Sequence, residues 1–301
     1  MIDICMLGTY GMMPLPGRWL SCALVRCGPT LTLFDCGEGT QIPWKSLGWG
    51  FRQLGAICFT HMHADHVAGL PGVLFMVGHA GRTEQLDIYG PVGTTYVIEG
   101  LRRIVPDLPF PIHIHEMRGG EHFSLPGELH GSCVAAAHGI PCLAYRAELK
   151  RKPAFQVDKA QALGLPVQLW SRLQHGETLT YNGQTITPAQ VLGEPRRGIT
   201  FAFITDTRPT AALSNFARDV DLLICESMYD APEDLALAQA NGHMIAHESA
   251  GIAKAAGAHS LVLTHFSPKI NDPALAEKAA RSVFAKTRAA RDGMVITLEF
   301  P

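Results

Sequence analysis

Four short apolar stretches of this chain each end in a histidine or an aspartate, and this repeated ending restricts the fold more than any other feature. The stretches are GAICFT, SCVAAA, ITFAFIT and SLVLT, and they lead into His61, His138, Asp206 and His265. Short apolar runs bounded by turn residues are typical of buried strands. Strand ends at one edge of a sheet converge in space on a rigid support. We therefore expect a sheet protein in which these four side chains meet.

The first of these endings opens a dense cluster of coordinating side chains, because His63, Asp65 and His66 follow His61 directly in the sequence HMHADH. Burying such groups without partners is costly, whereas a bound cation satisfies them. Imidazole and carboxylate groups suit Zn²⁺. Together with the other strand ends they are too many for one tetrahedral ion, but they suit two ions that share a bridging carboxylate. Two-metal sites clamp the attacking and the leaving oxygens of a phosphoryl displacement. The sequence therefore predicts a dinuclear hydrolase centre with two Zn²⁺ ions, or Mn²⁺ or another divalent cation, on His61, His63, Asp65, His66, His138, Asp206 and His265.

The wider pattern of apolar runs indicates an α/β (α+β) protein. Runs separated by Gly and Pro predict strands at 2–8, 21–28, 30–37, 55–61, 86–90, 132–139, 199–207, 221–227, 260–266 and 293–300. Apolar spacing near 3.6 predicts helices at 66–81, 94–105, 231–242 and 243–258. This order favours two mixed sheets with helices outside, an αββα four-layer sandwich. We expect a single domain over residues 1–301, with the polar segment 146–198 as an inserted arm and candidate exosite.

The charge of the chain restricts its partners. The net charge is −2, whereas proteins that wrap long nucleic acids nonspecifically are usually basic. Any contact with a polyanion must therefore come from a local patch. Nine Lys and Arg residues lie between Arg146 and Arg208, against five acidic residues. This excess is a candidate contact for nucleic acid, and its alternative is an ordinary solvated face.

The remaining composition points to the cytoplasm. No apolar run reaches the ~20 residues that a membrane helix needs, so we expect no membrane partner. The N-terminus MIDICMLGTYG lacks a basic leader with a long apolar stretch behind it, which argues against secretion. The eight cysteines include no CxxC pair. We interpret them as reduced, small buried side chains.

Several motifs also resemble a known family. THMHADH resembles the signature motif of the metallo-β-lactamase superfamily. LFDCGEGTQ, HADHVAGLPG, GEPRRGITFAFITDTRP and GHMIAHESAGIAKAAGAHSLVLTHFSP resemble its ribonuclease Z branch, which cleaves the 3′ trailer from precursor tRNA. The resemblance spans residues 5–270. It implies the αββα fold, a zinc-dependent phosphodiesterase that uses a metal-activated water, a precursor tRNA substrate and a homodimer.

The resemblance also implies roles for single residues. It places His61, His63 and His138 on a first metal, and Asp65, His66 and His265 on a second. Asp206 matches the bridging carboxylate, and Asp65 also matches the catalytic proton acceptor. His243 matches a catalytic histidine that protonates the leaving group or stabilises the transition state. Asp35 matches a carboxylate that orients a ligand histidine.

The chain departs from the branch at three places, and these keep other functions open. The early loop is GMMPLPGRWLS rather than a Pro-Lys-Arg-Asn-like stretch, the arm has GLPVQLW without Gly-Pro, and CESM stands where His-Glu-Ala-Thr is common. The first alternative is a related hydrolase of a small phosphodiester, cyclic phosphate or sulfate ester. A nucleic-acid-binding protein with a purely structural site is the second, and thioesterase or lactamase chemistry is a third.

Overall fold

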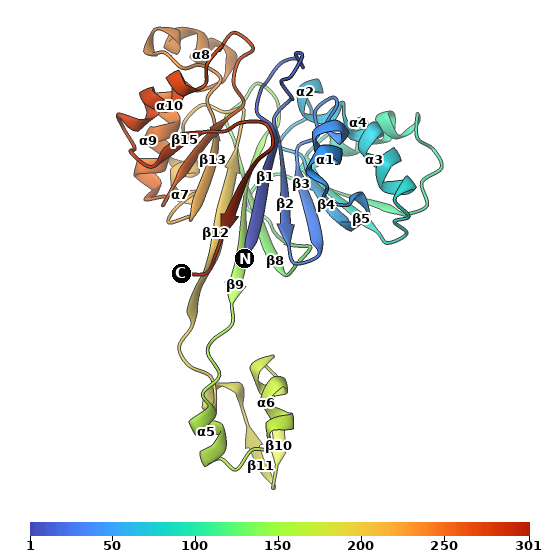
Figure 1. Ribbon diagram of the computed structural model, residues 1–301, viewed down its shortest axis with the longest axis vertical. Coiled ribbons are helices and arrows are strands. Elements are labelled where there is room, and N and C mark those ends of the chain that lie inside the picture. The colour runs from blue at the N-terminus through green and yellow to red at the C-terminus, as the bar shows by residue number, and fades with distance from the viewer. The chain divides into compact units, whose positions relative to one another are not determined.

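The computed structural model describes residues 1–301 and contains two seven-stranded sheets (Figure 1). The first sheet has the strand order β16-β1-β2-β3-β4-β5-β6. Its strands are β1 (Ile2–Gly8), β2 (Cys22–Cys27), β3 (Thr30–Phe34), β4 (Leu54–Cys58), β5 (Leu86–Pro91), β6 (Ile112–Met117) and β16 (Met294–Leu298). β1 is antiparallel to β16 and β2, β2 is antiparallel to β3, and β3 to β6 run parallel. The parallel strands direct their carboxyl ends to one edge.

The second sheet has the order β15-β14-β13-β12-β9-β8-β7. Its strands are β7 (His122–Leu125), β8 (Leu129–Ala135), β9 (Leu143–Arg151), β12 (Arg196–Ile204), β13 (Leu222–Glu226), β14 (Leu261–Thr264) and β15 (Thr287–Ala289). β12 to β15 run parallel, and β7 is antiparallel to β8. The strand that precedes Asp206 and the strand that precedes His265 therefore end at the same edge.

Helices complete the layers. Those packed with the first sheet are α1 (Gln41–Leu47), η1 (Phe51–Gln53), α2 (Ala64–Val67), α3 (Leu70–His79) and α4 (Thr94–Arg102). Those of the second half are α7 (Ala211–Phe216), η3 (Pro232–Asp234), α8 (Leu235–Asn241), α9 (Ala246–Ala256) and α10 (Ala274–Arg281). Between the sheets, the ring of Phe34 on β3 contacts Phe201 and Phe203 on β12, with both ring centroids at 5.7 Å. The predicted αββα layering is thus confirmed.

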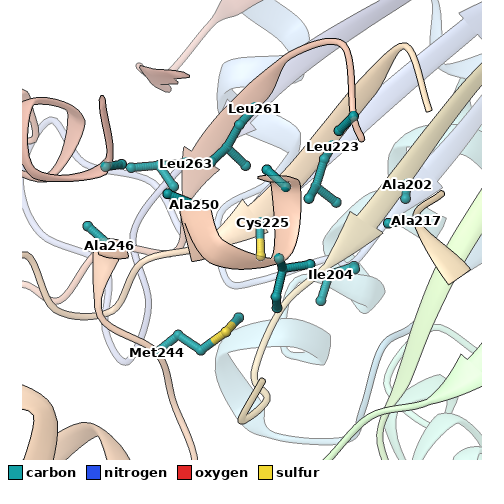
Figure 2. Packing of buried hydrophobic residues seen from close by; sticks show 14 of the residues in the cluster. Ala202, Ile204, Ala217, Leu223, Cys225, Met244, Ala246, Ala250, Leu261 and Leu263 are labelled. Atoms are coloured by element: carbon teal, nitrogen blue, oxygen red, sulfur yellow. The ribbon is translucent and has the colours of Figure 1, made fainter. Parts of the chain in front are cut away.

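Small side chains let α9 approach the second sheet closely (Figure 2). Side chains alternate between the two faces along each strand, so directly paired residues of neighbouring strands share a face of the sheet. The register aligns Ile204, Cys225 and Leu263 in one row across β12, β13 and β14. Ala246 and Ala250 of α9 belong to the same buried cluster. This packing positions the segment that leads into α9 beside the strand ends.

A second compact unit comprises Leu149–Ile199 and Phe300–Pro301, and the first comprises Met1–Glu148 and Thr200–Glu299. The second unit contains α5 (Val157–Ala162), α6 (Val167–Gln174), the hairpin β10 (Leu179–Tyr181) and β11 (Gln184–Ile186), and η2 (Pro188–Gln190). Its own apolar cluster includes Leu173, Leu179 and Val191. Most residues of the predicted arm lie in this unit, and their role as an exosite stays a prediction.

Two helix predictions need correction. The predicted helix 66–81 is interrupted between α2 and α3, because Gly69 lies against the loop after β3: its amide donates to Cys36 O at 2.9 Å. A Cβ at Gly69 would meet Gly37 O at 1.9 Å, so only glycine fits there. The predicted helix 243–258 begins at Ala246, which leaves His243 in a loop.

All eight cysteines are free and buried, as their interpretation as small apolar side chains requires. Burial raises the pKa of the Cys5 and Cys133 thiols to about 12. None of the helices combines the length and the apolar content needed to cross a bilayer.

Candidate metal centre

Four of the predicted ligands form one group at the edge where the two sheets end. Nε2 of His61 lies 3.0 Å from Nδ1 of His63, and Nε2 of His138 lies 3.4 Å from the same atom. Oδ2 of Asp206 lies 3.6 Å from Nε2 of His61. One ligand atom from each of these residues lies within 4.8 Å of all the others, so they can surround one cation.

The other predicted ligands form a second group around the same aspartate. Nε2 of His66 lies 3.1 Å from Nε2 of His265, and Asp65 Oδ2 lies 3.6 Å from the former and 3.7 Å from the latter. Oδ1 of Asp206 lies 3.1 Å from Nε2 of His265. Asp206 thus directs Oδ2 to the first group and Oδ1 to the second, so one carboxylate stands between two clusters of nitrogen donors.

Hydrogen bonds behind the clusters orient the imidazole rings. Nδ1 of His66 lies 2.8 Å from Oδ2 of Asp35, and Nδ1 of His138 lies 3.2 Å from Gly242 O. In its neutral form each ring would carry its single N–H on Nδ1, toward these acceptors, and its lone pair on Nε2, toward the cluster. Such outer partners fix the tautomer of metal-binding histidines. The converging lone pairs and carboxylate oxygens therefore fit divalent cations.

The close packing of these ionisable side chains shifts their pKa values. Burial, followed by the neighbouring His66, lowers the pKa of His61 well below its usual range. Burial acts in the same direction on His66, but Asp206 and Asp35 outweigh it and raise the pKa of that imidazole. The nearby histidines hold the pKa of Asp206 well below the ordinary value despite complete burial. The Asp206 carboxylate is therefore ionised at neutral pH.

The backbone at the strand ends adopts the left-handed region. Asp35, Asp206 and His265 have φ values of 58°, 52° and 56°. This conformation is uncommon for residues other than glycine and concentrates at functional sites, where surrounding structure maintains it. It turns each chain sharply after the strand, so that the side chain points into the cluster.

Asp65 lies at the accessible side of the second group. Its Oδ2 accepts a hydrogen bond from Met12 N at 2.7 Å. Burial raises the pKa of this carboxyl, but the nearby imidazoles of His265 and His66 outweigh burial and lower it. Asp65 is therefore ionised at neutral pH. The early loop passes close by, since a Cβ at Gly11 would meet the His265 ring at 2.5 Å.

His243 is stacked on His265, with ring centroids 5.6 Å apart, and its Nδ1 lies 3.2 Å from Oε2 of Glu226. Burial lowers the pKa of His243, but the hydrogen bond and the charge of Glu226 raise it to about 9. The imidazole is thus protonated at neutral pH and can donate a proton. It faces the same space as Asp206, with Nδ1 at 3.9 Å from Oδ2.

Glu226 is the functional residue that the sequence interpretation missed. It is fully buried at the end of β13 and also accepts hydrogen bonds from Thr207 N at 2.6 Å and Met244 N at 3.1 Å. The signal was present, because the apolar run DLLIC ends in this glutamate just as the other four runs end in a ligand.

A second carboxylate fixes the segment that carries His243. The Arg208 guanidinium donates to His243 O and forms an ion pair with Glu248. Oε2 of Glu248 also accepts from Ile245 N at 3.2 Å. Arg208 was counted in the basic excess between residues 146 and 208. In the structure its charge is paired with Glu248 within the first unit.

Comparison with known proteins places this site in a family. Residues 30–266 match the beta-lactamase superfamily domain. Curated sequences named Ribonuclease Z from Lachnoclostridium phytofermentans and Lachnospira eligens are 40% and 41% identical to this chain, over 100% of it and 99% of each relative. The crystal structure of the short form of human tRNase Z has the same fold, with a TM-score of 0.70, 22% identity and coverage of 99% and 100%. A metallo-beta-lactamase fold protein from Bacillus subtilis has a TM-score of 0.71 at 21% identity, over 98% of both chains.

Proposed function

This chain belongs to the ribonuclease Z family of the beta-lactamase superfamily and is a metal-dependent hydrolase, and on that premise we propose that it removes the 3′ trailer from precursor tRNA. The observation that carries the proposal is the position of Asp206, whose two carboxylate oxygens face two separate donor groups. A shared carboxylate is suited to a pair of metal ions, and paired ions suit phosphodiester hydrolysis.

We propose two Zn²⁺ ions as the cofactors. His61, His63 and His138 would hold one, Asp65, His66 and His265 the other, and Asp206 both. When bound, the ions would supply Lewis-acid chemistry for water and for the phosphodiester oxygens. The nitrogen-rich donor set favours zinc over calcium or magnesium, which prefer oxygen ligands.

Two side chains would move the protons. Asp65, ionised and accessible beside the second group, accepts the proton of the attacking water. The bond from the water oxygen to phosphorus forms as the bond to the leaving oxygen breaks. His243, kept protonated by Glu226, donates its proton to that leaving oxygen or stabilises the charge on the phosphoryl group.

The second unit would contact the tRNA body. Its residues 149–199 include Lys150, Lys152 and Lys159, and these three side chains are exposed. Seven basic and three acidic residues lie in this range. Cations that neutralise phosphates supply affinity without reading sequence. A precursor tRNA offers many such phosphates, whereas a small phosphodiester offers one.

We also propose a homodimer. Ile42 on α1, Phe75 on α3 and Tyr96 on α4 are 50%, 51% and 87% exposed, and these helices are neighbours in the first unit. Large apolar side chains gathered on one surface are typical of protein interaction sites. Light scattering at micromolar concentration is expected to give the mass of two chains, and the mass of one chain would contradict this.

The decisive experiment offers two substrates to protein purified without chelator. We expect cleavage of a precursor tRNA at the trailer junction, slower hydrolysis of bis-p-nitrophenyl phosphate, and two zinc ions per chain by elemental analysis. Hydrolysis of the small diester without any cleavage of precursor tRNA would instead identify a small-phosphodiester hydrolase. Full activity in protein that contains no metal would contradict the metal centre itself.

A further inference from the structure

A pocket of about 330 Å³ in the first unit adjoins the loop that carries His138. One wall comes from the carboxyl ends of β5 and β6, with Val92, Met117 and Arg118. The opposite wall is the segment that follows β8, with Ala136 and Pro141. Ligand pockets range from about 300 to 1,000 Å³, so this one has room for a single small group.

The loop that lines the second wall also carries a predicted metal ligand. The segment that forms its second wall includes His138, two residues beyond Ala136, and consecutive Cα atoms are only ~3.8 Å apart. This loop is held closed by a hydrogen bond from Ala136 N to Cys142 O at 2.9 Å. It is also anchored to the first sheet, since Leu143 N donates to Thr60 O at 2.8 Å. A ligand in the pocket would therefore contact the same loop that presents His138 to the cluster.

The lining combines apolar surface with one cation. Val92, Met117 and Pro141 offer hydrocarbon and sulfur atoms, on which the face of a base can rest. Arg118 is exposed, and Oε1 of Glu121 accepts from its backbone amide at 2.8 Å rather than from its guanidinium. The charge of Arg118 acts on the nearby Glu116, and its planar guanidinium is exposed and suited to binding a phosphate.

We propose that this pocket binds the first nucleoside of the trailer, with its base against the apolar walls and its 3′ phosphate on Arg118. The inference rests on the proposed cleavage of precursor tRNA. Unstacked single-stranded bases are the usual targets of pockets in RNA-binding proteins, and the trailer is single-stranded where it leaves the site. The exposed position of Arg118 lets the rest of the trailer continue into solvent.

The test compares three precursor tRNAs that differ only in the trailer: unmodified, abasic at the first trailer nucleotide, and abasic at the fourth. With wild-type protein, the first abasic change should raise KM about tenfold, because stacking of one base is worth about 1–3 kcal/mol. The abasic change at the fourth position should have no effect. The kcat values should remain within about twofold for all three substrates.

Variants of Val92 and Arg118 then test whether the rise in KM depends on the pocket. Val92→Phe fills it from an exposed position, and Arg118→Ala removes the guanidinium, while Arg288→Ala on β15 is the matched control. We expect Val92→Phe to raise KM for the unmodified precursor and to erase the difference between unmodified and first-position abasic substrates. Arg118→Ala should raise KM, and Arg118→Lys should restore part of the loss. The Arg288→Ala control should hydrolyse bis-p-nitrophenyl phosphate and cleave all three precursors as the wild-type protein does.

The outcomes distinguish a failure of the pocket proposal from a failure of the proposed cleavage of precursor tRNA. If wild-type protein cleaves the precursor but Val92→Phe keeps the full abasic penalty, the pocket is not the binding site, and the proposed function stands. The same holds if the first-position abasic change costs nothing in wild-type protein. If wild-type protein never cleaves the precursor, both proposals fail together.

Discussion

Nδ1 of His243 lies 3.2 Å from Oε2 of Glu226, a carboxylate that is completely buried at the end of β13. The glutamate holds the imidazole in one orientation and favours its protonated form, and it also accepts the backbone amides of Thr207 and Met244. A single carboxylate thus connects the loop after β12 with the segment before α9, and both carry site residues.

The Glu226→Gln variant tests this connection through the pH dependence of kcat. The pKa of His243 is raised to about 9, so its protonated form persists up to that pH and is lost above it. Without the carboxylate the pKa should fall toward ~6.5, the ordinary value for histidine. We expect the alkaline decline of kcat on precursor tRNA to begin at lower pH in the variant. An unchanged alkaline limb would show that His243 is not the proton donor.

His243→Ala should affect substrates according to their leaving group. Precursor tRNA releases an alkoxide that needs a proton, whereas p-nitrophenolate is stable without one. We expect kcat on precursor tRNA to fall by about 10²–10⁴-fold, the usual worth of general acid catalysis. Hydrolysis of bis-p-nitrophenyl phosphate should fall far less, and metal content should stay at the wild-type value. Equal losses of metal and of both activities would place His243 among the ligands.

Asp65→Ala should abolish turnover of both substrates while the protein stays folded. The variant loses a predicted ligand of the second cation and the acceptor for the proton of the attacking water. Circular dichroism and a cooperative thermal transition provide the control for folding. Because the side chain is partly accessible and lies outside the apolar clusters, we expect little change in secondary structure. Near-normal kinetics in this variant would refute its assignment.

The second unit is tested by replacing Lys150, Lys152 and Lys159 with alanine. Arg151 is left in place because its guanidinium stacks on the ring of Phe300, 5.2 Å from the centroid, and contacts Pro301. Each phosphate contact contributes ~0.9 to the slope of log K against log salt concentration. We expect weaker binding of precursor tRNA and a slope that is smaller by up to about three.

The control for that experiment removes three exposed lysines of the first unit, Lys254, Lys278 and Lys286. This triple variant has the same change in net charge and should keep the wild-type slope. Neither variant should alter hydrolysis of bis-p-nitrophenyl phosphate. If both variants lose tRNA affinity equally, net charge rather than the second unit governs binding.

The local sequence predicted which side chains lie together where one rule applied. Apolar runs that end in a coordinating residue located His61, His138, Asp206 and His265, because strand order and direction bring such ends together. The same rule applied to Glu226, but a glutamate within the sequence CES belongs to no coordination motif of its own. Its role depends on a histidine 17 positions away, which only the tertiary structure reveals.

Other features had no local signal. The ion pair of Arg208 with Glu248 joins residues 40 positions apart, and a charge count cannot distinguish it from a solvated surface. Strand β6 has the sequence IHIHEM and pairs only with β5. Its alternating histidines interrupt the apolar run by which the other strands were predicted. The break between α2 and α3 results from contact of Gly69 with a loop some thirty residues earlier in the chain.

The buried thiols give the molecule a set of internal reporters. A thiol reacts as its thiolate, and burial both raises the thiol pKa and blocks access, so alkylation must wait for local opening. Cys5, Cys22, Cys27 and Cys58 lie in the first sheet, and Cys133 and Cys225 lie in the second. Rates of alkylation resolved by mass spectrometry would therefore give separate opening free energies for the two sheets, without any introduced label. The range 149–199 contains no cysteine, so its motions would not contribute to the signal.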